Sequence, residues 1–378
     1  MAWSGIFLAI AHYYWKNRNE RHIGFSRIGY FILLASLAIW PISYAYSNHV
    51  KSVLPDGADV RRILFSSNGD LLITTDRSGN GAEKWNILRV STDKDVSDPF
   101  NLNRITDQYG LDPADFVMDR QGDTFIIGRT VVAKISPVGE SSIFAGQNSL
   151  TGSVDGSGSG ALFTQLGSMT IDAADNLFVT DGNLLRRISP SGMVTTVANF
   201  TSSGLDGGAM RATAALGRPA LGVFMGLIVD STGSVYCGDP LDHVLLKVSN
   251  EGRVTIYAGS PGQAGFVDGN GPTAKFTSPL AMAADKSGNI YVVDGYAVRK
   301  VTSDGNVTTL AGTPGKQGYV DGLGANALFT DIGAIAVDNM GNIVVSDTIN
   351  ATKTDGSWKY DIRIRRVSAT GEVSTLFR

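Results

Sequence analysis

Residue types that catalyse reactions or bind metal ions are few in this sequence. Its four histidines are His12, His22, His49 and His243, and three of them lie within the first fifty residues. A single cysteine, Cys237, excludes an intramolecular disulfide framework and a thiolate metal cluster. No histidine stands near a G-x-S-x-G-like turn, so no nucleophile–base pair is evident. Histidine-based zinc sites and covalent hydrolase chemistry are therefore disfavoured.

Carboxylates are also spread thinly. Charged residues make up 18% of the 378 residues, against about 25% in an ordinary soluble domain. Past residue 47 the glutamates are limited to Glu83, Glu140, Glu251 and Glu372, all at predicted turns or strand ends. This gives little support for a carboxylate cage around a metal ion, and no cofactor is expected. The net charge of −3, scattered along the chain, disfavours nucleic acid as a partner.

One acidic position recurs at fixed spacing within a longer motif. The three copies are VDGSGSGALF (154–163), VDGNGPTAKF (267–276) and VDGLGANALF (320–329). The structural interpretation is a turn in which glycine supplies a positive φ, the aspartate accepts hydrogen bonds from turn N–H groups, and the phenylalanine anchors a long loop. Calcium binding by the three aspartates (Asp155, Asp268 and Asp321) is the functional alternative. These carboxylates belong to different repeats, however, and each needs several further oxygen ligands.

From about residue 60 the chain consists of six repeats, and these must position the side chains named above. Each repeat has an apolar run, a Gly-containing turn, a second apolar run, and a basic residue before Ile or Val. The central pieces begin at residues 66, 119, 172, 230, 285 and 338, so their spacings are 53, 53, 58, 55 and 53. Four short strands per unit at this period predict an all-β fold, a six-bladed β-propeller with four-stranded blades over residues 60–378. A solenoid is the alternative, but its repeats are usually shorter and need polar capping units.

The pieces GNIYVVD and IRRVS, together with the VDG motif, resemble the NHL-repeat family of β-propellers in its bacterial, VDG-containing form. The resemblance covers about residues 60–378, and the first repeat departs most, because Ser66 replaces the opening Asp and the fourth apolar run does not match. It implies a range of activities, from peptide-amidating lyases, lactonases and strictosidine-synthase-like enzymes to non-catalytic domains that bind proteins or glycans. The lyase type depends on histidine ligands, and only His243 lies in the repeats. The lactonase type holds a calcium-class metal in the central channel with Glu, Asn and Asp.

Two charged positions also recur across the repeats. An aspartate ends the second strand in four of them: Asp181, Asp239, Asp294 and Asp347. A basic residue occupies one third-strand position in all six: Arg89, Lys134, Arg187, Lys247, Lys300 and Arg366. A ring of binding groups is one interpretation. The favoured one is a salt bridge or turn contact repeated within each blade, because a position shared by every blade is more often architectural.

Before the repeats, residues 29–47 form a run of nineteen residues without a charge. At 1.5 Å per residue this run is about 28 Å long as a helix, close to the roughly 30 Å hydrocarbon core of a bilayer. Tyr30, Trp40 and Tyr44 lie toward its ends, as interfacial aromatic residues do, and Pro41 is tolerated in a membrane helix. We expect a transmembrane anchor, since no later segment looks helical enough to cover such a run. Cleavage after Ala45 as a signal peptide is the alternative, but the segment is longer than usual.

The basic stretch 16–28 sets the orientation of this anchor. It carries Lys16, Arg18, Arg21 and Arg27 against Glu20, so the positive-inside rule places it in the cytoplasm. Residues 1–15 are expected to form a short apolar helix that lies in the interface, tilts through a thin region of the membrane or packs against a partner, and 48–59 are expected to form a linker. The propeller is then expected on the periplasmic side of the inner membrane, with a net charge of −6, because the first 47 residues contribute +3 of the total −3.

Segments that the repeat does not require are the best functional candidates. The longest is 348–361, TINATKTDGSWKYD, between the second and third strands of the sixth blade, and its counterpart in the first blade is 76–85. Ring closure makes these blades neighbours, so both insertions are expected on one face, near where the chain enters the propeller. The candidate binding residues there are Trp85, Trp358, Lys359 and Tyr360, and an ordinary flexible loop is the alternative.

The sequence therefore predicts a membrane-anchored, extracytoplasmic propeller that acts as a non-catalytic binding or scaffolding subunit of a membrane protein complex. Its expected partners are the other subunits of that complex and the lipid bilayer, through residues 29–47. The alternative is a tethered hydrolase or lyase of the lactonase kind, with a metal in the central channel.

Overall fold

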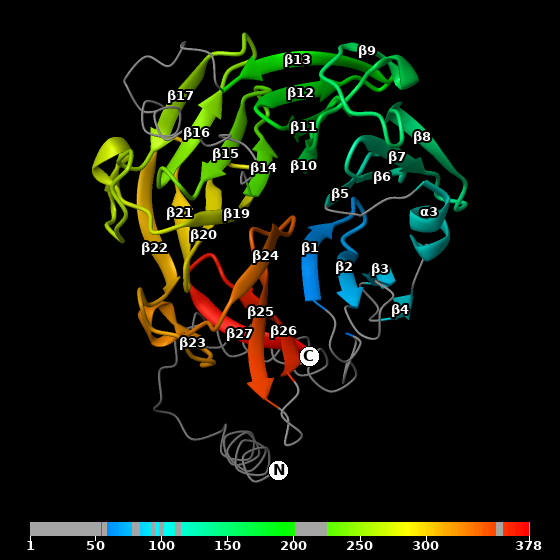
Figure 1. The fold of residues 1–378 in the computed structure, drawn as a ribbon. Coiled ribbons are helices and arrows are strands. Elements are labelled where there is room, and N and C mark those ends of the chain that lie inside the picture. Colours follow the sequence, from blue (N-terminus) through cyan, green and yellow to red (C-terminus); the bar gives the residue numbers. More distant parts are fainter. Residues whose placement is uncertain are drawn as a thin grey trace, which may run out of the picture. The chain divides into compact units, whose positions relative to one another are not determined.

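The chain divides between Asn48 and His49, and every described residue belongs to the second part. A computed structural model describes residues 54, 59–77, 84–91, 95–97, 102–109, 115–200, 225–352 and 358–377. These residues form six antiparallel sheets arranged as a ring (Figure 1). The predicted all-β, six-bladed propeller is confirmed.

Each blade runs outward from an inner strand. The inner strands are β1 (Asp59–Phe65), β5 (Asp115–Met118), β10 (Leu166–Ile171), β14 (Met225–Val229), β19 (Pro279–Ala284) and β24 (Ile332–Val337). The second strands are β2 (Leu71–Arg77), β6 (Thr124–Ile127), β11 (Leu177–Asp181), β15 (Val235–Asp239), β20 (Ile290–Asp294) and β25 (Ile343–Thr352). The third strands are β3 (Lys84–Val90), β7 (Val131–Ile135), β12 (Leu184–Ile188), β16 (Val244–Val248), β21 (Ala297–Val301) and β26 (Trp358–Val367). The outer strands are β4 (Val96–Ser97), β8 (Ser141–Gly146), β13 (Met193–Asn199), β17 (Val254–Ala258), β22 (Asn306–Gly312) and β27 (Glu372–Phe377).

The ring closes by packing of complete blades. Inner strands of successive blades contact one another, and β1 of blade 1 contacts β24 of blade 6. All four strands of blade 1 precede those of blade 2 in the chain, and all strands of blade 6 come last, so no strand is exchanged between the two (Figure 1). Blades 1 and 6 are therefore neighbours, as predicted.

The turn between the first and second strands is fixed by an aspartate in most blades. In blade 3 one carboxylate oxygen of Asp172 accepts the N–H groups of Ala174 and Asn176, both at 2.8 Å. Sheet-to-sheet packing then buries the strand that follows, and every residue of β11 is buried. The recurring pieces that open with aspartate thus mark a turn and the start of a core strand.

The VDG motif forms a fifth, two-residue strand and a short turn of 3-10 helix on the outside of blades 3, 5 and 6. The strands are β9 (Gly156–Ser157), β18 (Gly269–Asn270) and β23 (Gly322–Leu323), and the helical turns are η1 (Gly158–Gly160), η2 (Gly271–Thr273) and η3 (Gly324–Asn326). Each phenylalanine of the motif (Phe163, Phe276 and Phe329) is completely buried. Their predicted role as loop anchors is confirmed.

A short helix after blade 1 was not expected from the sequence. Helix α3 (Leu102–Tyr109) contacts β3, where β4 supplies only two residues of outer strand. Leu102 and Ile105 are buried in one cluster with Ile87 and Phe116. The helix therefore covers the side of blade 1 on which two residues of the fourth strand are described.

Candidate functional site

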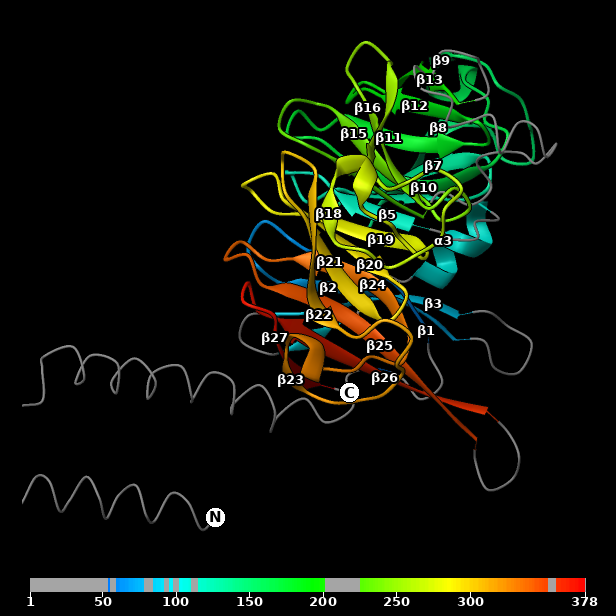
Figure 2. The same ribbon diagram turned by 90° about the vertical axis from the view of Figure 1, so that its left-hand side faces the viewer.

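The predicted insertion in blade 6 is an extension of the sheet. β25 and β26 have ten residues each, whereas the equivalent strands of blades 3, 4 and 5 have five. Their pairing continues without a bulge to Thr352 opposite Trp358. We call the part beyond Asp347 and Arg363, residues 348–352 and 358–362, the blade 6 arm. Figure 2 shows its strands running past the ends of the other blades.

Three of the candidate binding residues lie in this arm and one lies in blade 1. Trp358, Lys359 and Tyr360 are consecutive in β26, and Trp85 is the second residue of β3, paired with Asp76. The side chains of all four lie outside those that the structure describes.

The two insertions leave the ring on the same face. In both blades they join the second strand to the third, and β1 contacts both β25 and β26. The chain also enters blade 1 from this face, because Asp59 at the start of β1 pairs with Asp76 near the end of β2. We call it the insertion face.

Residues 1–53 lie outside the described part of the chain, and with them the proposed anchor residues Tyr30, Trp40, Pro41 and Tyr44. Within the described residues, no helix has both the length and the apolar character needed to cross a membrane.

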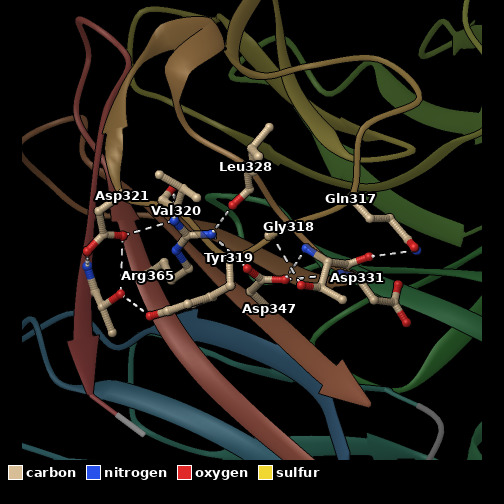
Figure 3. A network of polar contacts seen from close by, with 11 residues as sticks. Gln317, Gly318, Tyr319, Val320, Asp321, Leu328, Asp331, Asp347 and Arg365 are labelled. Atoms are coloured by element: carbon tan, nitrogen blue, oxygen red, sulfur yellow. Dashed lines mark hydrogen bonds and ion pairs between the residues drawn. The ribbon is translucent and has the colours of Figure 1, made fainter. Parts of the chain in front are cut away.

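The most developed polar network in blade 6 surrounds a completely buried arginine (Figure 3). Arg365 Nη1 donates to Asp347 Oδ2 at 2.7 Å, and its Nη2 donates to Asp321 Oδ1 at 2.9 Å. The same two nitrogens also donate to the backbone carbonyls of Leu328 and Val320, each at 2.7 Å. The arginine thus ties the third strand to the second strand and to the VDG motif.

Both acids of this network are satisfied from other directions as well. Asp347 Oδ1 accepts the backbone N–H groups of Thr330 and Asp331 at 2.8 and 3.0 Å. Asp321 Oδ2 accepts the N–H of Thr375 on the outer strand at 2.9 Å. The guanidinium carbon of Arg365 lies 4.6 Å from the ring centre of Phe329. An otherwise costly buried charge is therefore paired, hydrogen-bonded and stacked.

Blades 3 and 5 repeat this network residue for residue. The corresponding triads are Asp155–Arg186–Asp181 and Asp268–Arg299–Asp294, with arginine–carboxylate distances of 2.8–2.9 Å. Burial raises the pKa of Asp294, while Arg299 and the N–H groups of Thr277 and Ser278 lower it. The VDG aspartate therefore accepts bonds from an arginine and the outer strand, and not from its own turn as predicted.

This geometry supports the structural interpretation of the VDG aspartates over calcium binding. Asp268 uses both oxygens within the protein, since it accepts from Arg299 and from the N–H and hydroxyl of Thr309. We expect Asp268→Ala to lower the free energy of unfolding by about 1–3 kcal/mol, because it removes charged hydrogen bonds at a half-exposed site. Urea denaturation measures this loss, and a melting temperature that is unchanged by EDTA is expected for the wild type. A melting temperature that falls with EDTA and recovers with calcium would reverse this assignment.

The basic position that the sequence singled out is the neighbour of the residue that pairs with the strand-end aspartate. In blade 3, Arg186 binds Asp181, whereas Arg187 is exposed and donates to Asn176 at 2.8 Å. In blade 1, Arg89 pairs with Asp70 in the first turn, through a bond of 2.6 Å. The favoured interpretation, a salt bridge or turn contact within the blade, is therefore supported in blades 1 to 3, where Lys134 also pairs with Asp123. The strand-end aspartates of blades 3, 5 and 6 pair instead with the arginine one residue earlier in the third strand.

Blade 4 departs from the pattern, because Leu246 occupies the position of the buried arginine. Its strand-end acid, Asp239, is buried and accepts the N–H groups of Leu241 and Asp242, both at 3.0 Å. Asp242 is also buried, and burial with the nearby Asp239 carboxylate raises its pKa to about 6. His243 lies beside them and its Nδ1 is 2.8 Å from Thr277 O. These two acids form the acidic pair of blade 4.

The inner strands of blades 1 and 2 carry a further ion pair. Arg62 Nε lies 3.3 Å from Asp115 Oδ1, and Asp115 Oδ2 accepts the N–H of Met169 in blade 3 at 2.9 Å. Burial raises the pKa of Asp115, and Arg62 opposes that shift. This acid therefore serves to link three blades.

A cleft of about 600 Å³ lies between blades 3 and 4, on the face opposite the insertion face. Its walls are polar and include Arg187, Thr196, Asp230 and Asn250. At the position where the outer strands of blades 2 and 4 carry Phe144 and Tyr257, blade 3 carries Val197 (each precedes a buried alanine). The smaller side chain leaves this junction open, and sequence analysis missed it.

Enzyme chemistry gains no support from the described residues. They contain no group of three or more His, Cys, Asp or Glu side chains placed to hold a metal ion. Burial raises the pKa of the Cys237 thiol, which disfavours the thiolate that a nucleophile needs.

Comparison with known proteins places the chain by its fold. No family model matches it. It is 30% identical over 153 residues to teneurin-3 and 28% identical over 160 residues to teneurin-4, both from Mus musculus. These matches cover 36% and 39% of this chain but only 5% of either teneurin.

Solved structures from Bacteroides cover much more of the chain. A protein of unknown function from Bacteroides thetaiotaomicron has a TM-score of 0.57 at 19% identity, covering 82% of this chain and 73% of its own. Auxiliary nutrient binding proteins from B. thetaiotaomicron and Bacteroides ovatus have TM-scores of 0.54 and 0.53 at 14% and 16% identity, each covering 81% of this chain and 69% of its own. At these identities the likeness concerns the fold, and it agrees with the six-bladed β-propeller described above.

Proposed function

We propose that the chain is an NHL-type propeller, held by residues 29–47 on the periplasmic side of the inner membrane, that serves as a non-catalytic binding and scaffolding subunit of a membrane protein complex. The observation that carries this proposal is the blade 6 arm. It extends one hairpin beyond the blade, and the propeller architecture does not require it.

The path of the chain supports a membrane-facing role for the insertion face. The first strand begins at Asp59 on that face, and residues 48–58 are all that separate it from the proposed anchor. Eleven residues span at most about 40 Å when fully extended. The anchor therefore keeps the insertion face within about 40 Å of the bilayer, where a membrane-embedded partner is in reach.

Two further observations favour binding over catalysis. The three buried arginines bond to the aspartates of their own blade and of the VDG motif. These charges therefore form no open cluster that could bind a substrate or a metal ion. Asp115, on the inner strand of blade 2, is buried and held by Arg62 and two backbone N–H groups, and so it is poorly placed to bind a metal ion. The competing proposal, a lactonase-like hydrolase, requires a stoichiometric metal in the purified full-length protein that supports turnover.

Replacement of residues 350–360 by a two-residue Asn-Gly turn tests the proposal. It closes the hairpin at Ile349 and Asp361, which are paired in the sheet. We expect the tagged full-length variant, purified in mild detergent from its native host, to lose its co-purifying membrane subunits and to keep the wild-type urea midpoint.

The matched control changes apolar residues on the opposite face. Val138→Ser and Met340→Ser alter side chains that are more than four-fifths exposed in turns there. These variants are expected to keep the co-purifying subunits. The binding proposal fails if the shortened hairpin retains its partners, or if the wild type purifies as a lone 40.0 kDa chain.

A further inference from the structure

The outer edge of the blade 6 arm has no neighbouring strand among the described residues. β26 pairs with β25 along its whole length, but β27 pairs with β26 only from Ile364 to Val367. Residues 358–363 of β26 therefore have a strand on one side and no described strand on the other (Figure 2), and we call this second side the open edge. An open edge is a template for another strand.

The direction of each backbone group on this edge follows from the turn at the other end of β26. Ser368 N–H donates to Glu372 O at 2.8 Å, so the backbone of Ser368 faces β27. Strand backbones alternate, and β26 pairs with β25 without a register shift. Trp358, Tyr360 and Ile362 therefore direct their N–H and C=O groups to the open edge.

The opposite strand supports the same assignment. Thr348, the partner of Ile362, donates its N–H to Asp331 O at 2.8 Å, away from β26. Residues 359, 361 and 363 are accordingly the ones that bond to β25. The open edge thus offers three consecutive donor–acceptor positions with the spacing of an antiparallel ladder.

We propose that this edge pairs with the same edge of a second copy of the chain, in an antiparallel arrangement whose two-fold axis passes through Tyr360. Backbone alternation requires edge-facing residues to lie opposite edge-facing residues. The axis can then coincide with Lys359, Tyr360 or Asp361, and with no point between two residues. An axis at Ile362 is excluded, because it would place Tyr360 opposite Ile364, which already pairs with Phe377 of β27.

Charge decides between these three registers. An axis at Asp361 places Asp361 opposite itself and Lys359 opposite Arg363, so like charges meet. An axis at Lys359 places Lys359 opposite itself and pairs few residues. An axis at Tyr360 places Lys359 opposite Asp361 twice and Trp358 opposite Ile362 twice, with Tyr360 opposite itself. The edge is self-complementary in this register alone, as an isologous interface requires.

The described acid of this register has capacity for a second cation. The side chain of Asp361 is one-third exposed, and its Oδ2 accepts a hydrogen bond from Arg363 Nη2 at 3.0 Å. Arg363 also lies 3.9 Å from the ring centre of Tyr319. A lysine on an edge strand ordinarily blocks edge-to-edge pairing, and here a facing aspartate would neutralise it.

Charge reversal in the full-length chain tests this pairing. Copies with two different affinity tags are co-expressed, solubilised in mild detergent and captured through one tag, and native mass spectrometry identifies a two-copy species. Lys359→Asp and Asp361→Lys each place like charges opposite one another at two symmetric points. Each is expected to reduce the mixed-tag species at least about tenfold, since 1.4 kcal/mol suffices for that factor.

The double variant Lys359→Asp/Asp361→Lys restores both opposite pairs and is expected to recover the mixed-tag species to within about threefold of wild type. Lys286→Asp, an exposed residue in a turn on the other face, is the matched control and should have no effect. Urea midpoints of all variants establish that they remain folded. Unchanged capture in the single reversals, no recovery in the double variant, or no mixed-tag species in the wild type would each overturn the pairing.

This pairing does not depend on the membrane partner proposed above. Loss of the co-purifying subunits on shortening the hairpin concerns the partner, whereas the charge reversals keep the hairpin and report on the second copy. If the charge reversals abolish the two-copy species while the membrane subunits remain bound, the two interactions are separate. They are also separate if the membrane subunits are lost while the two-copy species remains.

Discussion

Replacement of Arg186 by leucine is expected to lower the free energy of unfolding by about 3–5 kcal/mol. Arg186 is completely buried and connects Asp181 of the second strand with Asp155 of the VDG motif. Removal of the guanidinium leaves the fully buried Asp181 carboxylate without its counter-ion. A buried charge without a counter-ion is costly. Removal of one partner of a buried ion pair therefore destabilises a protein by more than the net contribution of the intact pair to stability.

The adjacent residue provides a matched control. Arg187 is exposed, and its guanidinium donates to Asn176 Oδ1 at 2.8 Å. Arg187→Leu removes the same groups and is expected to cost less than about 1 kcal/mol. Urea denaturation of both variants measures the difference, and equal losses would contradict a special role for the buried position.

A second variant distinguishes the lost charge from lost packing. In Arg186→Leu/Asp181→Asn the carboxylate becomes a neutral amide whose oxygen still accepts the N–H groups of Thr164 and Gln165, which Asp181 Oδ1 accepts at 2.6 and 2.9 Å. We expect this double variant to recover part of the stability lost in Arg186→Leu. No recovery would mean that the stability comes from packing against Phe163, whose ring centre lies 5.4 Å from the guanidinium.

The blades themselves were predictable because their pattern is local and repeated. An aspartate-capped turn followed by a buried strand gives the same sequence pattern in blades 2 to 6, as Asp172 and β11 illustrate, and Ser66 replaces the aspartate in blade 1. Helix α3 was not predicted, although Leu102, Ile105 and Tyr109 stand at helical spacing. Eight residues give a weak periodic signal, and the packing of the helix beside the outer strand of blade 1, of which two residues are described, is a tertiary effect.

Distinguishing Arg186 from Arg187 was beyond the strand pattern alone, because adjacent residues face opposite sides of a sheet and either can be the buried one. A comparison among the blades does carry the signal. In the third strand, the residue just before the shared basic position is arginine in the blades that follow a complete VDG motif (Arg186, Arg299 and Arg365). In the other blades it is Leu88, Ala133 or Leu246. The aspartate of the motif and the arginine occur together because each needs the other's charge.

The face of the two insertions could be predicted from connectivity, since both join second and third strands. That the insertion of blade 6 is a paired arm was missed, although Asp355-Gly356 between its strands and the alternation of apolar and polar residues in WKYDI (358–362) are typical of a hairpin. The open edge of the arm could not be predicted, because it depends on where β27 stops pairing with β26. Its self-complementary register becomes visible only when the pairing with β25 and β27 fixes the direction of each backbone group.

In blade 4, where leucine replaces the buried arginine, removal of a buried carboxylate is expected to stabilise the protein. Asp242→Asn is expected to raise the free energy of unfolding by about 2–3 kcal/mol at pH 7.5 and by little at pH 4. Burial and the Asp239 carboxylate raise the pKa of Asp242 to about 6, from 3.8 in the unfolded chain. Between these values the folded protein binds more protons than the unfolded one, so stability falls as pH rises and the loss is complete above pH 6.

Asparagine cannot ionise, so the variant escapes this loss while keeping the size of the side chain. The backbone contacts of residue 242 are unaffected, since its N–H donates to Asp239 and its carbonyl accepts from Gly262. Urea midpoints of wild type and variant at both pH values give the difference. Asp304→Asn is the control with the opposite sign, because the Thr302 hydroxyl lowers the pKa of this exposed acid, and it should not gain stability at pH 7.5. A gain in Asp242→Asn that is the same at pH 4 and pH 7.5 would show that packing, and not the charge of the acidic pair of blade 4, is responsible.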